Sequence, residues 1–166
     1  MRQLAAIFLI TSFALTGCAW FGRQPQYEPP LPRATYQRVN ITPYSGASSE
    51  PGAPAATARG TPYQSGAISS AAADWARWPA GTLFRVLATG NLYEVDDFTD
   101  DIVGMNTILL YKPGSIGAPS AAPNFVTIEI IRWGSPRDSA DILRSQKSST
   151  AKKILAELVA RYPEKP

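Results

Sequence analysis

Short runs of alternating apolar and polar residues recur along the middle and second half of the chain and predict β-strands. The clearest run is 125–133, in which Val126, Ile128 and Ile130 fall on one face of an extended backbone. Most of the residues between them are polar, which is the pattern of a strand with one buried face. Shorter runs predict further strands at 38–44, 82–87, 92–97 and 106–111.

Two helices are predicted after the last strand. The first is expected over 136–143, because Ser135 can cap it, a proline follows, and Asp138 lies in the first turn. Ser148 or Ser149 can cap the second. Its apolar residues recur at helical spacing and form one stripe: Ile154, Leu155, Leu158, Val159 and Tyr162. We expect this stripe to pack against the barrel. A helix that binds a partner or the membrane surface is the alternative, which the few scattered basic residues do not favour.

The first residues resemble the export signal of a bacterial lipoprotein. An apolar run at 4–15 follows a single positive charge and is too short to span a bilayer. It ends in LTGC at 15–18, which resembles the lipobox, whose cysteine is acylated and becomes the first mature residue. We therefore predict a signal peptide at 1–17 and a lipid anchor on Cys18, with an ordinary secretory signal or an uncleaved anchor as the alternative. Ala19 follows where an inner-membrane retention aspartate would stand, which favours the outer membrane, facing the periplasm.

Composition divides the rest of the chain into a tether and one domain. Residues 18–37 are rich in proline and glutamine and predict an extended tether, and residues 38–166 are long enough for a single domain. Within that domain, glycine, proline, alanine and serine dominate 47–66 and 114–123. Both stretches predict loops, and the first is expected to be long and flexible.

Several classes of function are excluded by residue types that the chain lacks. It contains no histidine and one cysteine, Cys18, so catalysis by Ser/His or Cys/His pairs and the usual zinc sites are excluded. Without residues 1–17 the net charge is about +2, which argues against nucleic acid as a partner. We predict no cofactor and no metal site. Carboxylates, lysines, tyrosines and hydroxyls remain as the groups available for chemistry.

Four sequence blocks in consistent order carry a resemblance to a known family. They are AAD at 72–74 with PAGT at 79–82, YEVDD at 93–97 with IVG at 102–104, NTILLY at 106–111, and a closing strand that ends in Trp133-Gly134. Together they resemble the three-aspartate (3D) domain, and the resemblance covers roughly residues 38 to 143. It implies a mainly β fold, a six-stranded double-psi β-barrel, here followed by one or two C-terminal helices.

This barrel is shared with the membrane-bound lytic transglycosylases of the A type, in which it grips peptidoglycan glycan strands and an aspartate protonates the glycosidic oxygen. The resemblance places the aspartate usually given that role at Leu109, where the family reads Asn-x-Ile-Asp-aliphatic-Tyr. Strand parity puts Thr107, Leu109 and Tyr111 on one face, with polar neighbours, so we expect Leu109 to face the cleft. The alternative is that Leu109 faces the barrel interior as an ordinary core residue. A leucine cannot supply the ~10²–10⁴-fold that general acid catalysis contributes.

The remaining acids offer two catalytic candidates, Asp97 and Asp74. Asp97 shares its predicted strand face with Tyr93 and Val95 and is therefore expected to be partly buried. Asp74 either assists catalysis or braces the chain by accepting backbone hydrogen bonds. Four acids stand close together: Asp96, Asp97, Asp100 and Asp101. Such acids either raise one another's pKa or form a solvated turn.

Aromatic residues complete the predicted site. Trp75 or Trp78 is expected to stack on sugar rings, with core or rim packing as the alternative for both, and Thr107 and Tyr111 are further substrate-binding candidates. The sequence therefore predicts a lipid-anchored cell-envelope protein that binds peptidoglycan glycan strands with weak or no cleavage. One alternative is an active lytic transglycosylase or glycosidase that uses Asp97. Another is a structural envelope lipoprotein that binds a second protein.

Overall fold

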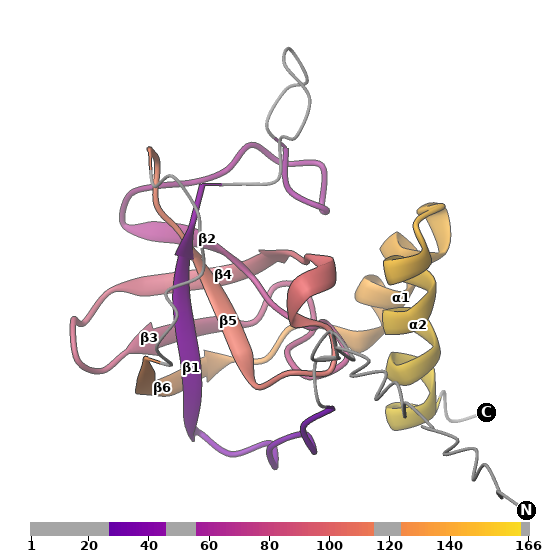
Figure 1. The fold of residues 1–166 in the computed structure, drawn as a ribbon, viewed down its shortest axis with the longest axis horizontal. Helices are drawn as coiled ribbons and strands as arrows, with labels where there is room; N and C mark the ends of the chain where they lie inside the picture. The colour runs from indigo at the N-terminus through magenta and orange to yellow at the C-terminus, as the bar shows by residue number, and fades with distance from the viewer. Residues whose placement is uncertain (1–26, 46–55, 115–123, 164–166) are drawn as a thin grey trace, which may run out of the picture.

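The computed structural model describes residues 27–45, 56–114 and 124–163, which form a closed six-stranded barrel with two helices on one side (Figure 1). The order of the strands around the barrel is β1-β5-β2-β4-β3-β6. The prediction of a six-stranded β-barrel followed by C-terminal helices is confirmed. The strands are β1 (Tyr36–Tyr44), β2 (Ile68–Ala72), β3 (Leu83–Val86), β4 (Leu92–Asp97), β5 (Thr107–Tyr111) and β6 (Phe125–Arg132).

The barrel wall is mixed, and one of its seams is short. β1 pairs with β5 and β2 pairs with β4 in parallel, while the other neighbours are antiparallel. β2 and β5 pair through only two positions, Ala71 with Leu110 and Ala72 with Leu109. Beyond these pairs the end of β5 and the start of β2 separate, so the wall opens at this seam.

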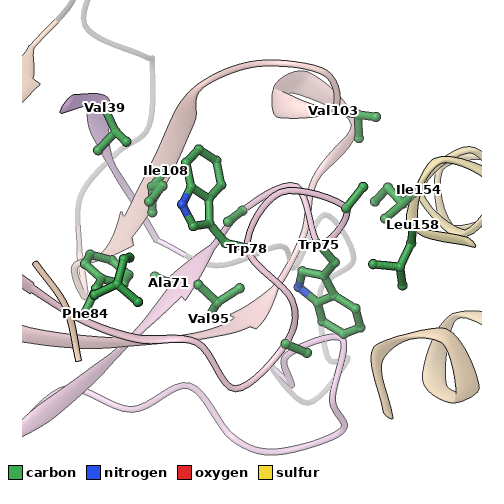
Figure 2. Packing of buried hydrophobic residues seen from close by; sticks show 14 of the residues in the cluster. Val39, Ala71, Trp75, Trp78, Phe84, Val95, Val103, Ile108, Ile154 and Leu158 are labelled. Atoms are coloured by element: carbon green, nitrogen blue, oxygen red, sulfur yellow. The ribbon is translucent and has the colours of Figure 1, made fainter. Parts of the chain in front are cut away.

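Every strand contributes aliphatic or aromatic side chains to the barrel interior, although the first residues of β2 do not. Val39, Phe84, Val95 and Ile108 are fully buried in one cluster (Figure 2). Ile154 and Leu158 of the last helix belong to the same cluster, together with partly buried residues of that helix. The prediction that the apolar stripe packs against the barrel is confirmed for these residues, whereas Val159 is 44% exposed.

The two helices begin where the sequence predicts. Helix α1 (Pro136–Ser145) is capped by Ser135, whose Oγ accepts the Asp138 N–H at 3.1 Å, and it extends two residues beyond the predicted end. Helix α2 (Ser149–Arg161) is capped by Ser148, whose Oγ accepts the Ala151 N–H at 3.0 Å. Neither helix in the described part of the chain is long and apolar enough to cross a membrane.

The strands differ from the sequence prediction mainly at β2. The five predicted strands are present, with ends shifted by one or two residues. β2 (ISSAA) carries no alternating pattern and little strand propensity. Its serines and alanines are small because the strand lies between β4 and β5, where Ala71 and Ala72 are fully buried.

The part of the predicted tether that the structure describes is docked on the barrel. The Glu28 N–H donates to the Gly104 carbonyl at 2.8 Å, and the Glu28 carboxylate accepts the Asn106 N–H at 2.7 Å. The Tyr27 hydroxyl donates to Glu157 of α2 at 2.8 Å. The prediction of a tether reaching to residue 37 is therefore wrong for residues 27–35, because hydrogen bonds hold them to the domain. Cys18 and residues 1–17 lie outside the described residues.

The PAGT and Trp-Gly motifs meet in a tight structural contact. Gly81 has a φ of +87°, and the Thr82 hydroxyl donates to the Pro79 carbonyl at 2.6 Å. The same hydroxyl accepts the Gly134 N–H at 3.0 Å. A Cβ on Gly134 would overlap the carbonyl oxygens of Pro79 and Ala80. These motifs therefore fix how the end of β6 meets the start of β3.

Candidate functional site

A β-bulge places two consecutive carboxylates on the same side of the barrel wall. Ala71 pairs with Val95 and Ala72 pairs with Asp97, so Asp96 is an extra residue in β4. Val95 points into the core, and Asp97 points to the opposite side. The prediction that Asp97 shares a face with Val95 is wrong because the bulge interrupts the alternation. Its predicted burial is confirmed, since only 4% of the residue is exposed.

Both carboxylate oxygens of Asp97 accept hydrogen bonds. Oδ1 accepts the Ala58 N–H at 3.0 Å, and Oδ2 accepts the Tyr63 hydroxyl at 2.6 Å and, more weakly, the Tyr44 hydroxyl at 3.5 Å. Burial raises the pKa of Asp97, and these hydrogen bonds, with one from the Phe98 N–H, act against that rise. Both oxygens of Asp97 thus accept hydrogen bonds from the protein, and the residue is almost fully buried.

Asp96 is buried beside Asp97 but is less fully bonded. Its Oδ2 accepts the Ser70 hydroxyl at 2.5 Å. Ser70 in turn accepts the Gln64 N–H at 2.9 Å, which leaves the serine proton for Asp96. Oδ1 of Asp96 has no hydrogen-bond partner among the described residues. Burial, followed by the charge of Asp97, raises the pKa of Asp96 to about 6.

Leu109 lies in the same lateral row as Asp97. Ala72 of the strand between them pairs with Asp97 on one side and with Leu109 on the other. Leu109 packs with Tyr44, Tyr63 and other residues of a small outer cluster, apart from the barrel core. Leu109 therefore lies outside the barrel core, and the alternative that it is barrel core is wrong. It does not line the groove described below, so its predicted place in an open cleft stays a prediction.

Asp74 occupies a different environment. It is fully buried, and its carboxylate accepts the N–H groups of Ala76 and Gly104, each at 2.9 Å. The Arg77 Nε lies 3.4 Å from the same carboxylate. Burial raises the pKa of Asp74. Asp74 shares none of its described hydrogen-bond partners with Asp97, so its contacts are those of a residue that braces the chain at the end of β2.

The four neighbouring acids separate into two pairs. Asp96 and Asp97 are buried, whereas Asp100 and Asp101 are exposed in a short 3-10 turn, η1 (Asp100–Ile102). The Thr150 hydroxyl of α2 donates to Asp100. The exposed pair therefore forms a solvated turn, and Asp97 of the buried pair is the acid in the same lateral row as Leu109.

Trp75 and Trp78 do not form a sugar platform. Both rings lie in the core, with 0% and 1% of the residue exposed, so neither ring face is open to a ligand (Figure 2). The Trp75 Nε1–H donates to the Asp97 carbonyl at 2.9 Å, and the Trp78 Nε1–H donates to the Gln37 side chain at 2.9 Å. The prediction of sugar stacking is wrong for both, because each indole packs inside the hydrophobic core. The Trp75 indole also holds the backbone of Asp97 through its hydrogen bond.

A groove of about 450 Å³ lies where the β2–β5 seam opens. One wall includes Tyr111, which stacks on Tyr63 with ring centroids 4.8 Å apart, and Tyr63 is bonded to Asp97. Through Tyr111 the groove borders the side of the barrel that carries the acids, although Asp96, Asp97 and Leu109 do not line it. It is lined by Ile41, Thr42, Pro43, Ser65, Ser69, Asn91, Tyr93, Leu110, Tyr111, Lys112, Pro113 and Asn124.

The chemistry of the groove suits a polyhydroxylated ligand. Hydroxyl and amide groups offer donors and acceptors, two tyrosine side chains offer flat apolar surface, and Lys112 is the single charged side chain among the described lining residues. Tyr111 was predicted as a substrate-binding residue and lines the groove. Thr107 was predicted with it but is buried and does not line the groove.

Other groove residues escaped sequence reasoning because their strands are not adjacent in the sequence. Ser69 and Tyr93 come from β2 and β4, and only the parallel pairing of these strands brings them together.

Tyr63 lies in the stretch predicted as a flexible loop, and no pattern in that stretch indicates a bonded residue. Its described part, from 56 to 67, is a loop, as predicted, but hydrogen bonds fix it to β2 and β4.

Within the described residues, no group of three or more Asp, Glu, His or Cys side chains could hold a metal ion.

The comparisons with known proteins identify no relative. No family model matches the chain, and no curated protein matches its sequence.

Proposed function

We propose that this protein binds peptidoglycan glycan strands along the groove at the β2–β5 seam and cleaves them weakly or not at all. The observation that carries the proposal is the row Asp97, Ala72 and Leu109 across three neighbouring strands. An acid and an aliphatic residue lie on either side of Ala72, on the face where the 3D-type resemblance leads us to expect catalysis.

Binding is supported by the shape and lining of the groove. A volume of about 450 Å³ accommodates a small number of sugar units, and Tyr93 and Tyr111 supply ring faces for their C–H surfaces. Ser69, Asn91 and Asn124 supply hydrogen-bonding groups from different strands and loops. A groove with one cation and many neutral polar groups favours a sugar chain over a strongly charged polymer.

Weak or absent cleavage is supported by the state of the acids. Glycoside cleavage through an oxocarbenium-like state needs a proton donor at the leaving oxygen, and two carboxyl groups flanking the bond are usual. Leu109 supplies neither, and both oxygens of Asp97 are committed to donors of the protein. Asp74 braces the chain elsewhere.

The lipobox-like LTGC at 15–18 supports a lipid anchor on Cys18 in the outer membrane, facing the periplasm. Tyr27, the first described residue, follows Cys18 by nine positions, a reach of at most about 30 Å for an extended chain. A lipid on Cys18 therefore holds the barrel within about 30 Å of the membrane, as suits a ligand in the cell wall.

Co-sedimentation of the purified domain with isolated sacculi tests the proposal. Tyr111→Ala should lower the bound fraction several-fold, because it removes a groove wall. Tyr36→Ala, a matched change at a tyrosine 59% exposed and outside the groove, should leave binding unchanged. Equal binding by both variants and the parent, or no binding by the parent, would contradict the proposal.

A further inference from the structure

Residues 57–64, here named the cover loop, lie across the face that carries Asp96, Asp97 and Leu109. The loop contains no helix or strand, and most of it is exposed. Beneath it the two carboxylates are only 6% and 4% exposed. The loop therefore covers the two buried acids.

Most contacts of the cover loop are made to the acid pair or to groups that bond it. Ala58 N–H and the Tyr63 hydroxyl donate to the Asp97 carboxylate. Arg59 N–H donates to the Asp96 carbonyl at 3.2 Å, and Gln64 N–H donates to Ser70, whose hydroxyl donates to Asp96. Gln146 of the loop after α1 adds one bond, to the Ala58 carbonyl at 3.0 Å.

The charged side chains around the pair do not neutralise it. Glu94 of β4 lies near it, and both Arg59 of the cover loop and Arg132 of β6 pair with Glu94, at 2.5 and 3.3 Å, rather than with either aspartate. The remaining titratable neighbours are Tyr44 of β1 and Tyr63, both neutral donors to Asp97. No described cation pairs with Asp96 or Asp97. Two adjacent buried carboxylates without a cation favour keeping one of them protonated, and Oδ1 of Asp96, which has no hydrogen-bond partner among the described residues, is available to carry the proton.

We propose that protonation of the Asp96–Asp97 pair controls the cover loop, which is closed while the pair holds a proton and is released when both acids are ionised. We call this dependence on protonation the lock. This inference rests on the proposed function for its consequence, since the cover then controls how far a glycan in the groove can move toward Leu109. The lock itself is a property of the described residues alone and does not need a glycan.

The direction of the pH effect follows from the two states of the loop. In the closed state the pKa of Asp96 is about 6, whereas an aspartate exposed by opening has a pKa of about 3.9. The closed state therefore binds more protons than the open state. Closure is strongest below about pH 4 and weakens as the pH rises toward 6, by about tenfold in the closed-to-open ratio per pH unit, and then levels off.

Amide hydrogen exchange of the whole domain tests the lock. The informative amides are those of Ala58, Arg59 and Gln64, whose bonds hold the loop, and the β6 amide of Ile130 reports global unfolding. After correction for intrinsic exchange, protection of the loop amides should fall by about tenfold per pH unit between pH 4 and 6. Ile130 should not follow. A pH-independent protection of the loop amides would overturn the proposal.

Two variants separate the lock from other causes. Asp96→Asn is neutral at every pH and should keep the loop protected throughout, whereas Asp101→Asn, at an exposed acid, should retain the parent's pH dependence. If Asp96→Asn does not fold, the parent and Asp101→Asn still decide, because pH-independent protection of their loop amides refutes the lock. A pH dependence of loop protection in Asp96→Asn equal to that of the parent would refute the lock even if glycan binding is confirmed. If the protection of the loop amides falls with pH as expected but the domain binds no glycan, the lock stands and the proposed function is wrong.

Discussion

Replacing Leu109 by aspartate should restore glycan cleavage, because it returns a carboxylate to the position beside Asp97. Neighbouring strands lie about 4.8 Å apart, so the Cα atoms of positions 97 and 109, separated by the strand that holds Ala72, are about 10 Å apart. Side chains from one face can lean toward each other over such a distance. The two carboxyl groups would then fall within the roughly 6.5–9.5 Å typical of inverting glycosidases.

The charge of Asp97 should also tune the new acid. At about 8 Å and an effective dielectric constant of about 20, two charges interact by about 2 kcal/mol. That interaction raises a pKa by about 1.5, which brings an aspartate closer to the range in which a general acid works. A proton donor at this position is expected to raise cleavage by ~10²–10⁴-fold over the parent.

The structural cost should be modest because Leu109 is only half-buried. Loss of its apolar contacts costs about 1–2 kcal/mol, and the tyrosine hydroxyls nearby can bond the new carboxylate. The assay is the release of anhydro-sugar or reducing-end products from isolated sacculi, with the melting temperature measured in parallel. Leu109→Asn is the matched control, since it has the same size and polarity but no transferable acid proton. A folded Leu109→Asp variant that releases no more product than Leu109→Asn would refute the reasoning.

Three further predictions test the structure and the anchor. Gly134→Ala should destabilise the domain by about 1–3 kcal/mol and lower its melting temperature, because the added Cβ meets backbone carbonyls. In the control Gly66→Ala the added Cβ meets nothing within 4 Å, so the melting temperature should be unchanged. Asp74→Ala should cost about 3–5 kcal/mol in chemical denaturation, since it leaves the Arg77 guanidinium buried beside no carboxylate; an unchanged denaturation midpoint would contradict the bracing role. Cys18→Ser should move the protein from the membrane fraction to the soluble fraction of the cell, and retention in the membrane would exclude the lipid anchor.

The strands that sequence reasoning predicted are those whose side chains alternate between core and surface. The pattern around Ile128 and Ile130 predicts β6 because one face enters the core. The same reasoning misses β2, whose Ala71 and Ala72 must be small to pack between two strands and therefore give no alternation. Parity along β5 correctly predicts the face of Leu109, because β5 has no bulge.

The site was predicted less completely because it depends on departures from regular structure. The bulge at Asp96 turns Asp97 away from Val95, and no residue preference in YEVDD announces it. The tryptophans were assigned to the ligand because aromatic type alone does not separate sugar platforms from core residues; burial decides for the core. Tyr63 reaches Asp97 from a loop whose composition predicts only a lack of helix or strand.

The most direct test of the central claim is a single incubation of the unmodified domain with isolated sacculi, followed by measurement of both bound protein and released sugar products. The account predicts that the domain co-sediments with the sacculi and releases little or no anhydro-sugar or reducing-end product. Release at a rate comparable to that of a three-aspartate relative with all three acids would contradict the loss of activity assigned to Leu109, and a failure to co-sediment would contradict the assignment of the groove to glycan.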